Sequence, residues 1–231
     1  MRNIGSGERR GKGRVLAVKA NESAGPDTQD QLLIAASDLM IKRGVADITL
    51  SDISVRSGLN SALVKYYFGN KAGLMLALLR KSLTRSISDL RHISELSSLP
   101  TEKLRVHISG IVNTYSRYPY INRVMHQLIS ENAEIFEPLI AEEFLKPVAE
   151  AQRKILNEGL KAGFFIEVDP ELFYFQITGA CEQRFFGVQH LNRVFELETQ
   201  SALSAKEFSA YLYKIILNGI SAPSRQIQNA S

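Results

Sequence analysis

The side chains best suited to contacting a ligand lie close together in residues 61–71, which read SALVKYYFGNK. Within this segment Lys65 is followed directly by two tyrosines, Tyr66 and Tyr67. Phenolic hydroxyls and a lysine ammonium can hydrogen-bond to phosphate oxygens and to base edges. The chemistry that this segment supports is therefore recognition of nucleic acid.

Signatures of catalysis are absent from the sequence. The four histidines are scattered and show no metal-ligand spacing, and no phosphate-binding glycine loop or nucleophile elbow is found. The paired acids Glu142 and Glu143 are most simply a solvated helix face. We therefore expect no enzyme activity, no cofactor and no metal site.

Two short helices are expected to position the basic and aromatic segment. Thr49-Leu50-Ser51-Asp52 matches a capping box, with Asp in place of the usual Glu, and it opens a helix that stops at Gly58. That helix is expected to bury Leu50, Ile53 and Val55. Asn60 is a suitable N-cap for a second helix from about Ser61 to Phe68. The pair is typical of a helix-turn-helix, which presents its second helix to the DNA major groove.

The flanking segments complete this small domain. Apolar residues recur at helical spacing from Thr28 until Gly44, which predicts a first helix. Ile53, Leu59, Val64 and Phe68 are expected to form the core between the helices. Lys71 then opens a longer helix, where a cation opposes the helix dipole. Its position makes sense if the side chain holds a phosphate.

Charge is distributed unevenly along the chain. The net charge is +4, and residues 1–26 contain six basic and two acidic residues, whereas residues 82–231 contain fifteen basic and seventeen acidic ones. Residues 1–26 are rich in Gly, Ser and charge, which indicates a disordered arm. We expect this basic arm to add contacts along the duplex. The alternative is a solvated extension without a role.

The remainder of the chain is expected to be helical throughout, which predicts an all-α protein. The expected helices cover 72–96, 101–117, 119–132, 134–161, 170–191 and 205–220, and prolines 138 and 147 should divide or kink the fourth of these. No apolar run is long enough for a membrane span, and no signal peptide is evident. The one cysteine, Cys181, fits a reducing compartment, so a cytoplasmic location is expected.

The segment ITLSDISVRSGLNSALVKYYFGNKAGL resembles the DNA-binding motif of the TetR/AcrR family of one-component repressors. The family pattern is roughly TT-x-x-DIA-x-x-AGVS-x-GTLYYHF-x-SK-x-x-L. The positions that match it, or carry close substitutes, are Thr49, Asp52, Ile53, Gly58, Val64, Tyr67, Phe68, Lys71 and Leu74. The length and the helical C-terminal region also agree with the family.

The resemblance implies three groups of DNA contacts. Thr49 should cap its helix and touch a phosphate. Four residues of the second helix should face base edges, namely Ser61, Ala62, Leu63 and Lys65. Tyr66, Tyr67 and Lys71 should hold the backbone. The chain departs from the family pattern at two of these positions, because Leu63 replaces Thr or Ser and Lys65 replaces Tyr.

Two apolar stripes in the C-terminal region are candidates for a homodimer interface. A lone helix-turn-helix contacts few base pairs, so specific binding commonly uses a two-fold dimer on a palindrome. The resemblance implies that two helices pair with their symmetry mates as a four-helix bundle. The interface residues expected are Leu172, Phe175, Gly179, Gln183, Phe186, Leu212, Ile215 and Ile216. The alternative is that both stripes are intrachain core.

The resemblance also implies a cavity for a small-molecule effector. Polar or soft residues on apolar helical faces are the candidates for its lining. The expected pocket residues are Tyr115, Tyr118, Arg123, His126, Gln176 and Arg184. Each can equally have a structural role, such as an arginine pairing with Glu131 or Glu182 across the core. The chemical identity of the effector is left open.

These observations predict a basic arm at 1–26, a helix-turn-helix domain at 27–73 and a helical effector-binding and dimerisation domain at 74–231. The leading hypothesis is a homodimeric repressor that leaves its palindromic operator when it binds an effector. Two alternatives remain. The first is a DNA-binding regulator controlled by a protein partner, and the second, more remote, is a helical enzyme or carrier.

Overall fold

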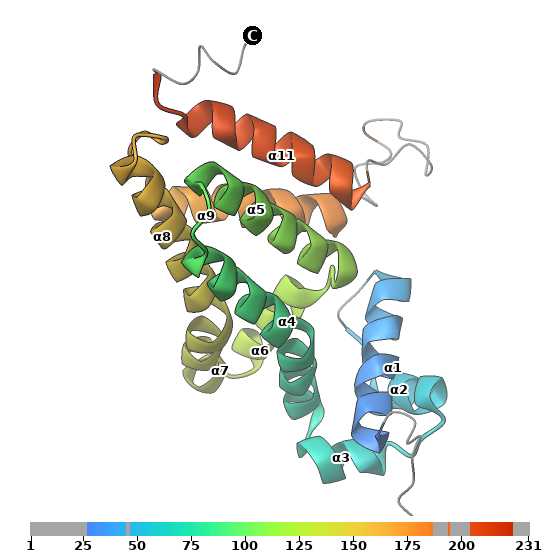
Figure 1. Cartoon of the computed structure of the whole chain (residues 1–231). Helices are drawn as coiled ribbons and strands as arrows, with labels where there is room; N and C mark the ends of the chain where they lie inside the picture. The colour runs from blue at the N-terminus through green and yellow to red at the C-terminus, as the bar shows by residue number, and fades with distance from the viewer. Residues whose placement is uncertain (1–26, 45–46, 187–193, 195–203, 224–231) are drawn as a thin grey trace, which may run out of the picture.

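The computed structural model describes residues 27–44, 47–186, 194 and 204–223, and these residues form an all-α protein (Figure 1). No strand occurs in this part of the chain, where Phe165 and Ser221 make an isolated antiparallel bridge. The expected fold class is thus confirmed. The arm at 1–26 lies outside the described residues, as do residues 187–191 at the end of one predicted helix.

The N-terminal helices are α1 (Thr28–Arg43), α2 (Leu50–Ser57) and α3 (Ala62–Phe68). Helices α1 and α2 stop at Gly44 and Gly58, as the sequence predicted, and both glycines adopt the left-handed conformation, with φ of 65° and 72°. Two ion pairs join α1 to α2: Arg43 to Asp52 at 2.7 Å and Arg56 to Asp38 at 2.5 Å. The first three predicted helices are therefore confirmed.

One residue predicted to be buried in α2 is on the outside. Val55 is 83% exposed, whereas Ile53 is fully buried and Leu50 is half-buried. Residues two apart on a helix point about 200° apart, so Val55 and Ile53 cannot share the inner face. The prediction for Val55 was wrong for this reason.

The larger helical body begins with α4 (Lys71–Glu95), which also packs on α1 and α3. The predicted domain boundary at residues 73 and 74 falls inside this helix. Helix α5 lies centrally, in contact with α4, α8, α9 and α11 (Figure 1). The remaining helices are α5 (Pro100–Arg117), α6 (Ile121–Glu131), α7 (Ala133–Ile140), α8 (Lys146–Lys161), α9 (Pro170–Phe185) and α11 (Ala205–Ile220).

The predicted break in the segment 134–161 is present. A π-helical turn, η1 (Ala141–Leu145), separates α7 from α8. Pro138 lies inside α7, and Pro147 lies in the first turn of α8. A proline ring clashes with the carbonyl four residues earlier, and a widened turn relieves that clash. The π turn brings Phe144 into the core. Among the described helices, none is both long and apolar enough to cross a membrane.

Candidate nucleic-acid interface and cavity

The turn between α2 and α3 is held by local hydrogen bonds. Ser54 Oγ donates to the carbonyl of Leu59 at 2.5 Å, and Asn60 Oδ1 accepts from the amide of Ala62 at 2.8 Å. Asn60 thus satisfies a free amide at the start of α3, although the helix itself begins at Ala62. These contacts fix the direction in which α3 leaves the turn.

The inner face of α3 anchors it to the core. Val64 is fully buried, and Phe68 is half-buried against the same cluster. Leu63 also packs against this cluster and is half-buried. Because part of the Leu63 surface is used in packing on the domain, only its exposed part is available to a base edge, and its role in DNA contact stays a prediction.

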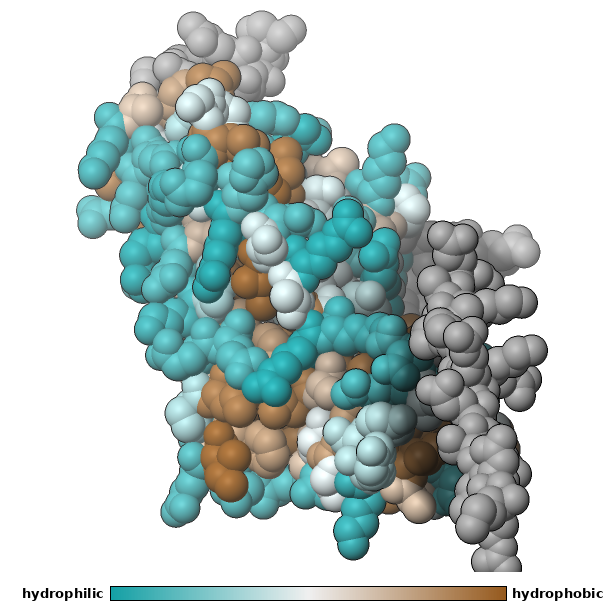
Figure 2. Space-filling view, turned by 60° about the horizontal axis from the view of Figure 1, so that its bottom comes forward, coloured by the Kyte–Doolittle hydropathy of each residue, from teal (hydrophilic) through white to brown (hydrophobic). Residues whose placement is uncertain are grey.

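The outer face of α3 presents the side chains that could contact DNA. Ala62, Lys65, Tyr66 and Tyr67 are exposed, and Ser61 is half-exposed. Tyr66 is 79% exposed, and its ring and the Tyr67 ring pack in a T-shaped arrangement with 4.9 Å between centroids. Figure 2 turns this end of the molecule forward and shows a mainly hydrophilic surface with separate hydrophobic patches.

The hydrogen-bonding groups of Thr49 are used to cap α2. Its hydroxyl and its amide both donate to Asp52 Oδ2, at 2.7 and 2.8 Å, and the amide of Asp52 donates back to Thr49 Oγ1 at 3.0 Å. These bonds and the Arg43 guanidinium hold the pKa of Asp52 well below its usual value, with the Arg43 contact as the largest cause. The capping role is confirmed. A phosphate contact would require Thr49 to release the carboxylate.

Lys71 occupies the first residue of α4, as predicted, but it has a partner. Its Nζ lies 3.1 Å from Asp47 Oδ1. The Asn70 side chain caps the same helix by accepting from the amide of Gly73 at 2.8 Å. The lysine is therefore held beside the start of α4, close to the end of α3, where a phosphate would have to compete with Asp47.

Gly73 is a structurally important residue that sequence reasoning missed. A Cβ at this position would lie 2.0 Å from the backbone carbonyl oxygen of Phe68, the last residue of α3. Only glycine allows the end of α3 to approach the first turn of α4 so closely. A glycine inside the first turn of a long helix was the available signal.

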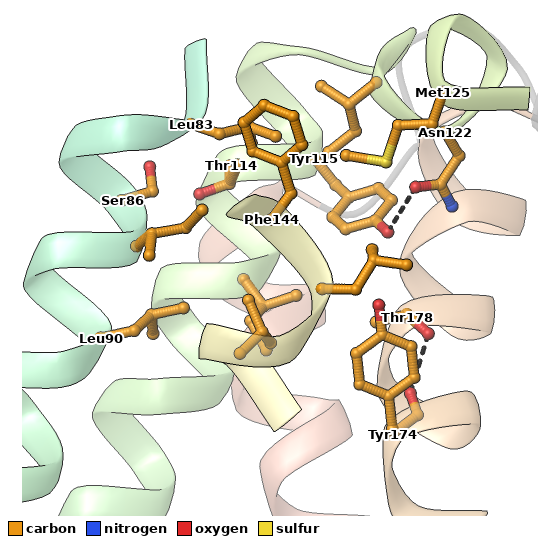
Figure 3. Close-up of a pocket in the computed structure, with 15 residues that line it drawn as sticks. Leu83, Ser86, Leu90, Thr114, Tyr115, Asn122, Met125, Phe144, Tyr174 and Thr178 are labelled. Atoms are coloured by element: carbon orange, nitrogen blue, oxygen red, sulfur yellow. Dashed lines mark hydrogen bonds between the residues drawn. The ribbon is translucent and has the colours of Figure 1, made fainter. Parts of the chain in front are cut away.

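A cavity of about 60 Å³ lies in the helical body between α4, α5, α6, α8, α9 and the π turn (Figure 3). No lining residue is charged, and most are apolar. Leu83, Ser86 and Leu90 of α4 form one side, and Tyr174 and Thr178 of α9 form the opposite side (Figure 3). Apolar lining with a few polar groups is typical of small-molecule sites.

A chain of hydrogen bonds lies at one wall of this cavity. Tyr115 Oη donates to Asn122 Oδ1 at 3.0 Å (Figure 3), and Asn122 Nδ2 donates to Glu182 Oε2 at 2.8 Å. Burial raises the pKa of the Tyr115 hydroxyl, which therefore stays protonated. Asn122 and Glu182 orient that hydroxyl, whose lone pairs can accept a further hydrogen bond.

Only one of the six expected pocket residues lines the cavity, namely Tyr115. Tyr118 lines a separate polar groove with Lys81 and Arg85. Two others are arginines that stack on aromatic rings: the Arg123 guanidinium is 4.3 Å from the Phe186 centroid and that of Arg184 is 5.5 Å from the Phe185 centroid. His126 and Gln176 are exposed on α6 and α9. Helical periodicity identified polar residues on each helix separately, but it did not show which helices together line the cavity.

Only some of the residues in the two predicted dimer stripes are exposed on the surface of the chain. Leu172, Phe175, Gly179 and Gln183 are exposed along one face of α9. On α11, Ile215 is exposed together with Tyr211, which the prediction omitted. The predicted residues that are instead buried or half-buried in the chain itself are Phe186, Leu212 and Ile216. Leu212 and Ile216 belong to the intrachain core, and α11 packs chiefly on α5.

Comparison with known proteins places both halves of the chain in one family. Residues 32–78 match the family described as bacterial regulatory proteins, tetR family, and residues 96–226 match the tetracyclin repressor-like C-terminal domain. The chain is 26% identical to the transcriptional activator FasR of Mycolicibacterium smegmatis over 136 residues and 36% identical to the regulator TtgR of Pseudomonas putida over 115 residues. These alignments cover 58% and 47% of this chain, and 60% and 54% of the relatives.

Solved structures share the fold. The regulator FadR of Bacillus subtilis, solved in complex with stearoyl-CoA, aligns with a TM-score of 0.61 at 18% identity, over 82% of this chain and 98% of FadR. The ketosteroid regulator KstR2 of Mycobacterium tuberculosis aligns with a TM-score of 0.60 at 21% identity, over 86% of this chain and 97% of KstR2. With a family match over residues 96–226 and a second over the helix-turn-helix, the chain belongs to the TetR family of bacterial regulatory proteins.

Proposed function

We propose that this protein is a cytoplasmic transcription regulator that binds a palindromic operator as a homodimer, with α3 in the major groove. The exposure of Lys65, Tyr66 and Tyr67 on α3, while the buried Val64 anchors the helix to the core, is the observation that carries the proposal. The basic arm at 1–26 is proposed to add contacts with phosphates. Membership of the family supports the DNA-binding role.

The test is selection of bound duplexes from random DNA by the purified full chain, followed by affinity measurements on the selected site. We expect Lys65→Ala to weaken binding and to reduce the slope of log K against log salt by about one if it contacts a phosphate. Tyr66→Ala should weaken binding as well. Lys161→Ala, an exposed lysine at the far end of α8, is the matched control and should bind as the wild type does. Selection that returns no common sequence would refute the proposal.

We further propose that the protein is a repressor released by a small-molecule effector held in the cavity. The C-terminal match to a tetracyclin repressor-like domain supports repression, whereas the relative FasR is an activator. The complex of FadR with stearoyl-CoA supports an effector with a large apolar part. Expression of a reporter gene placed downstream of the selected operator shows whether the protein represses or activates transcription. Repression requires expression to rise when the regulator is deleted.

Tyr120 offers a physical connection between the cavity and the DNA-binding helices. Its buried hydroxyl lies 2.9 Å from Ser37 Oγ of α1 and 3.2 Å from Ser82 Oγ of α4. The next two residues, Ile121 and Asn122, line the cavity. An effector that displaces the start of α6 therefore acts on α1 through these hydrogen bonds.

Removing this hydroxyl should weaken the coupling without abolishing either binding event. We expect Tyr120→Phe to reduce, by severalfold, the ratio of operator Kd with and without effector, which typically ranges from about 5 to 150 in coupled systems. Tyr213→Phe, which removes a hydroxyl bonded to the carbonyl of Thr101, is the matched control. An unchanged ratio in Tyr120→Phe would show that coupling follows another route.

A regulator without a small-molecule effector is the second candidate, and the cavity size favours it. At about 60 Å³ the cavity has room for only a few water molecules, whereas ligand sites commonly measure about 300–1,000 Å³. An effector must therefore enlarge the cavity on binding. If no compound in a metabolite panel raises the melting temperature or releases the operator, control by a protein partner becomes the better explanation.

A further inference from the structure

Two buried polar side chains in the helical body have no hydrogen-bonding partner among the residues that the structure describes. His107 of α5 is fully buried, and neither Nδ1 nor Nε2 has a partner. Gln152 of α8 is 1% exposed, and both its amide nitrogen and its oxygen are unpartnered. An unsatisfied buried polar group costs stability, so two in one region require an explanation.

Both side chains lie one helical turn beyond the wall of the cavity. Ile111 and Val148 line the cavity, and they are four residues from His107 and Gln152 on α5 and α8, respectively. Residues four apart share a helix face, and α5 and α8 are in contact. The two unpartnered groups therefore belong to the next layer of the bundle, beneath the cavity.

An ion pair lies next to this layer, on the side away from the cavity. Lys103, four residues before His107 on α5, is buried and donates to Glu158 of α8 at 2.6 Å and to the carbonyl of Ser94 at 3.1 Å. Its charge is already compensated. Burial lowers the pKa of His107 to about 4, so its ring is neutral at neutral pH. A neutral histidine and a glutamine each offer a donor and an acceptor, but no net charge.

We propose that an elongated, uncharged effector passes the cavity floor at Leu90 and Ile111 and places its polar end between His107 and Gln152. The inference rests on the proposed effector-binding function and names the chemical class of the ligand, an apolar chain or ring system that ends in a hydroxyl or a carbonyl. An ionised carboxylate is disfavoured, because its charge would be buried and the nearby cation, Lys103, is already paired with Glu158. Separation of α5 and α8 at this layer also enlarges the cavity toward the volume of a typical ligand site.

Straight-chain primary alcohols of six to twelve carbons are suitable probes, with alkanoates of equal length for comparison. Calorimetry on the full chain without DNA should show affinity rising with chain length, with an additional increase once the hydroxyl reaches His107 and Gln152. At those lengths His107→Leu and Gln152→Met should each weaken binding by about tenfold, the typical value of one hydrogen bond. Shorter alcohols should bind these variants as they bind the wild type, and alkanoates should bind more weakly than alcohols.

Control variants separate recognition from a structural role. His92→Leu and Gln127→Met lie outside the cavity wall and should leave every affinity unchanged. His107→Gln retains a donor and an acceptor, so it should keep most of the affinity that His107→Leu loses. If His107→Leu does not fold, the His107→Gln variant takes its place in the experiment. Equal losses at all chain lengths, or no loss in either variant, would overturn the proposal and indicate a site for a structural water only.

The same experiment distinguishes this inference from the proposed function. All variants should bind the selected operator as the wild type does in the absence of probe. Wild-type operator binding together with length-independent alcohol affinities would overturn this inference alone. Failure of the wild type to select any operator would instead overturn the proposed regulatory function, whatever the calorimetry shows.

Discussion

Lys71 and Asp47 show how one ion pair can adjust DNA affinity. The Lys71 side chain is 27% exposed and Asp47 is 88% exposed, at 3.1 Å between Nζ and Oδ1. The carboxylate offsets part of the charge that Lys71 would offer to a phosphate, and it adds a repulsive charge of its own. The lysine is thus held in position at the start of α4 while its attraction for DNA is reduced.

Removing this carboxylate should tighten DNA binding. We expect Asp47→Asn to lower the operator Kd by a factor of about two to five, the range that exposed ion pairs typically represent. Asp89→Asn makes the same change in net charge on an exposed part of α4 and is the control. Fluorescence anisotropy at several salt concentrations measures both. An equal gain in Asp89→Asn would show an effect of net charge rather than of Lys71.

His107 predicts a pH dependence of stability. Its folded pKa of about 4 lies below the ordinary value of 6.5, so the unfolded chain binds the additional proton between these pH values. The contribution of neutral His107 to the free energy of unfolding is fully present above about pH 6.5, and it is lost as the pH falls toward 4. Urea unfolding should show a decline of up to about 1.4 kcal/mol per pH unit in this window from this group. His107→Leu should remove that part of the decline, and His92→Leu should keep it.

At the scale of the elements, the junction of α3 and α4 depends on Gly73. The carbonyl of Phe68 occupies the space that a side chain at residue 73 would need. Because the obstacle is backbone rather than a flexible side chain, α3 itself must move when a Cβ is added. The orientation of the recognition helix is therefore coupled to the first turn of α4, which continues into the cavity wall.

Gly73→Ala should consequently impair both stability and DNA binding. We expect a loss of about 1–3 kcal/mol in the free energy of unfolding, typical of overpacking, together with weaker operator binding. Gly110→Ala provides the contrast, since its Cβ would meet the Leu90 Cδ2 atom, a side chain that can give way, at 3.2 Å. It should affect DNA binding little. Denaturant unfolding and anisotropy measure the two effects, and wild-type affinity in Gly73→Ala would contradict the coupling.

At the scale of the whole molecule, α9 and α11 leave apolar side chains in contact with solvent. Leu172 and Phe175 on α9 are 61% and 58% exposed, and Tyr211 and Ile215 on α11 are exposed to a similar extent. A Cβ added at Gly179 would meet nothing within 4 Å, so this face can approach another helix closely. We propose that a second copy of the chain covers it, as an apolar interface core requires.

Placing a charge on this surface should separate the protomers. We expect Phe175→Glu to shift the protein toward monomer in analytical ultracentrifugation and to weaken binding to a palindromic site, because both half-sites must be held together. Leu160→Glu adds the same charge at a 43% exposed position on α8 and should remain dimeric. A wild-type sedimentation profile for Phe175→Glu would exclude this face as the interface.

The sequence by itself determined the features that depend on near neighbours. The capping box of Thr49 and Asp52, the helix stops at Gly44 and Gly58, and the break near Pro147 all arise from contacts within a few residues. Local hydrogen bonds and backbone sterics decide such features, so they can be read without knowing the fold. The helix-turn-helix and the all-α class follow from them.

Only the tertiary structure decided which side chains meet across the chain. Asp47 lies 24 residues before Lys71, and the cavity wall combines α4, α5, α6, α8, α9 and the π turn. On α11, Ile215 and Ile216 are adjacent in sequence, yet the first is exposed and the second is buried. Helical periodicity defines faces on each helix separately. The face that becomes core, cavity or surface is chosen by how the other helices pack against it.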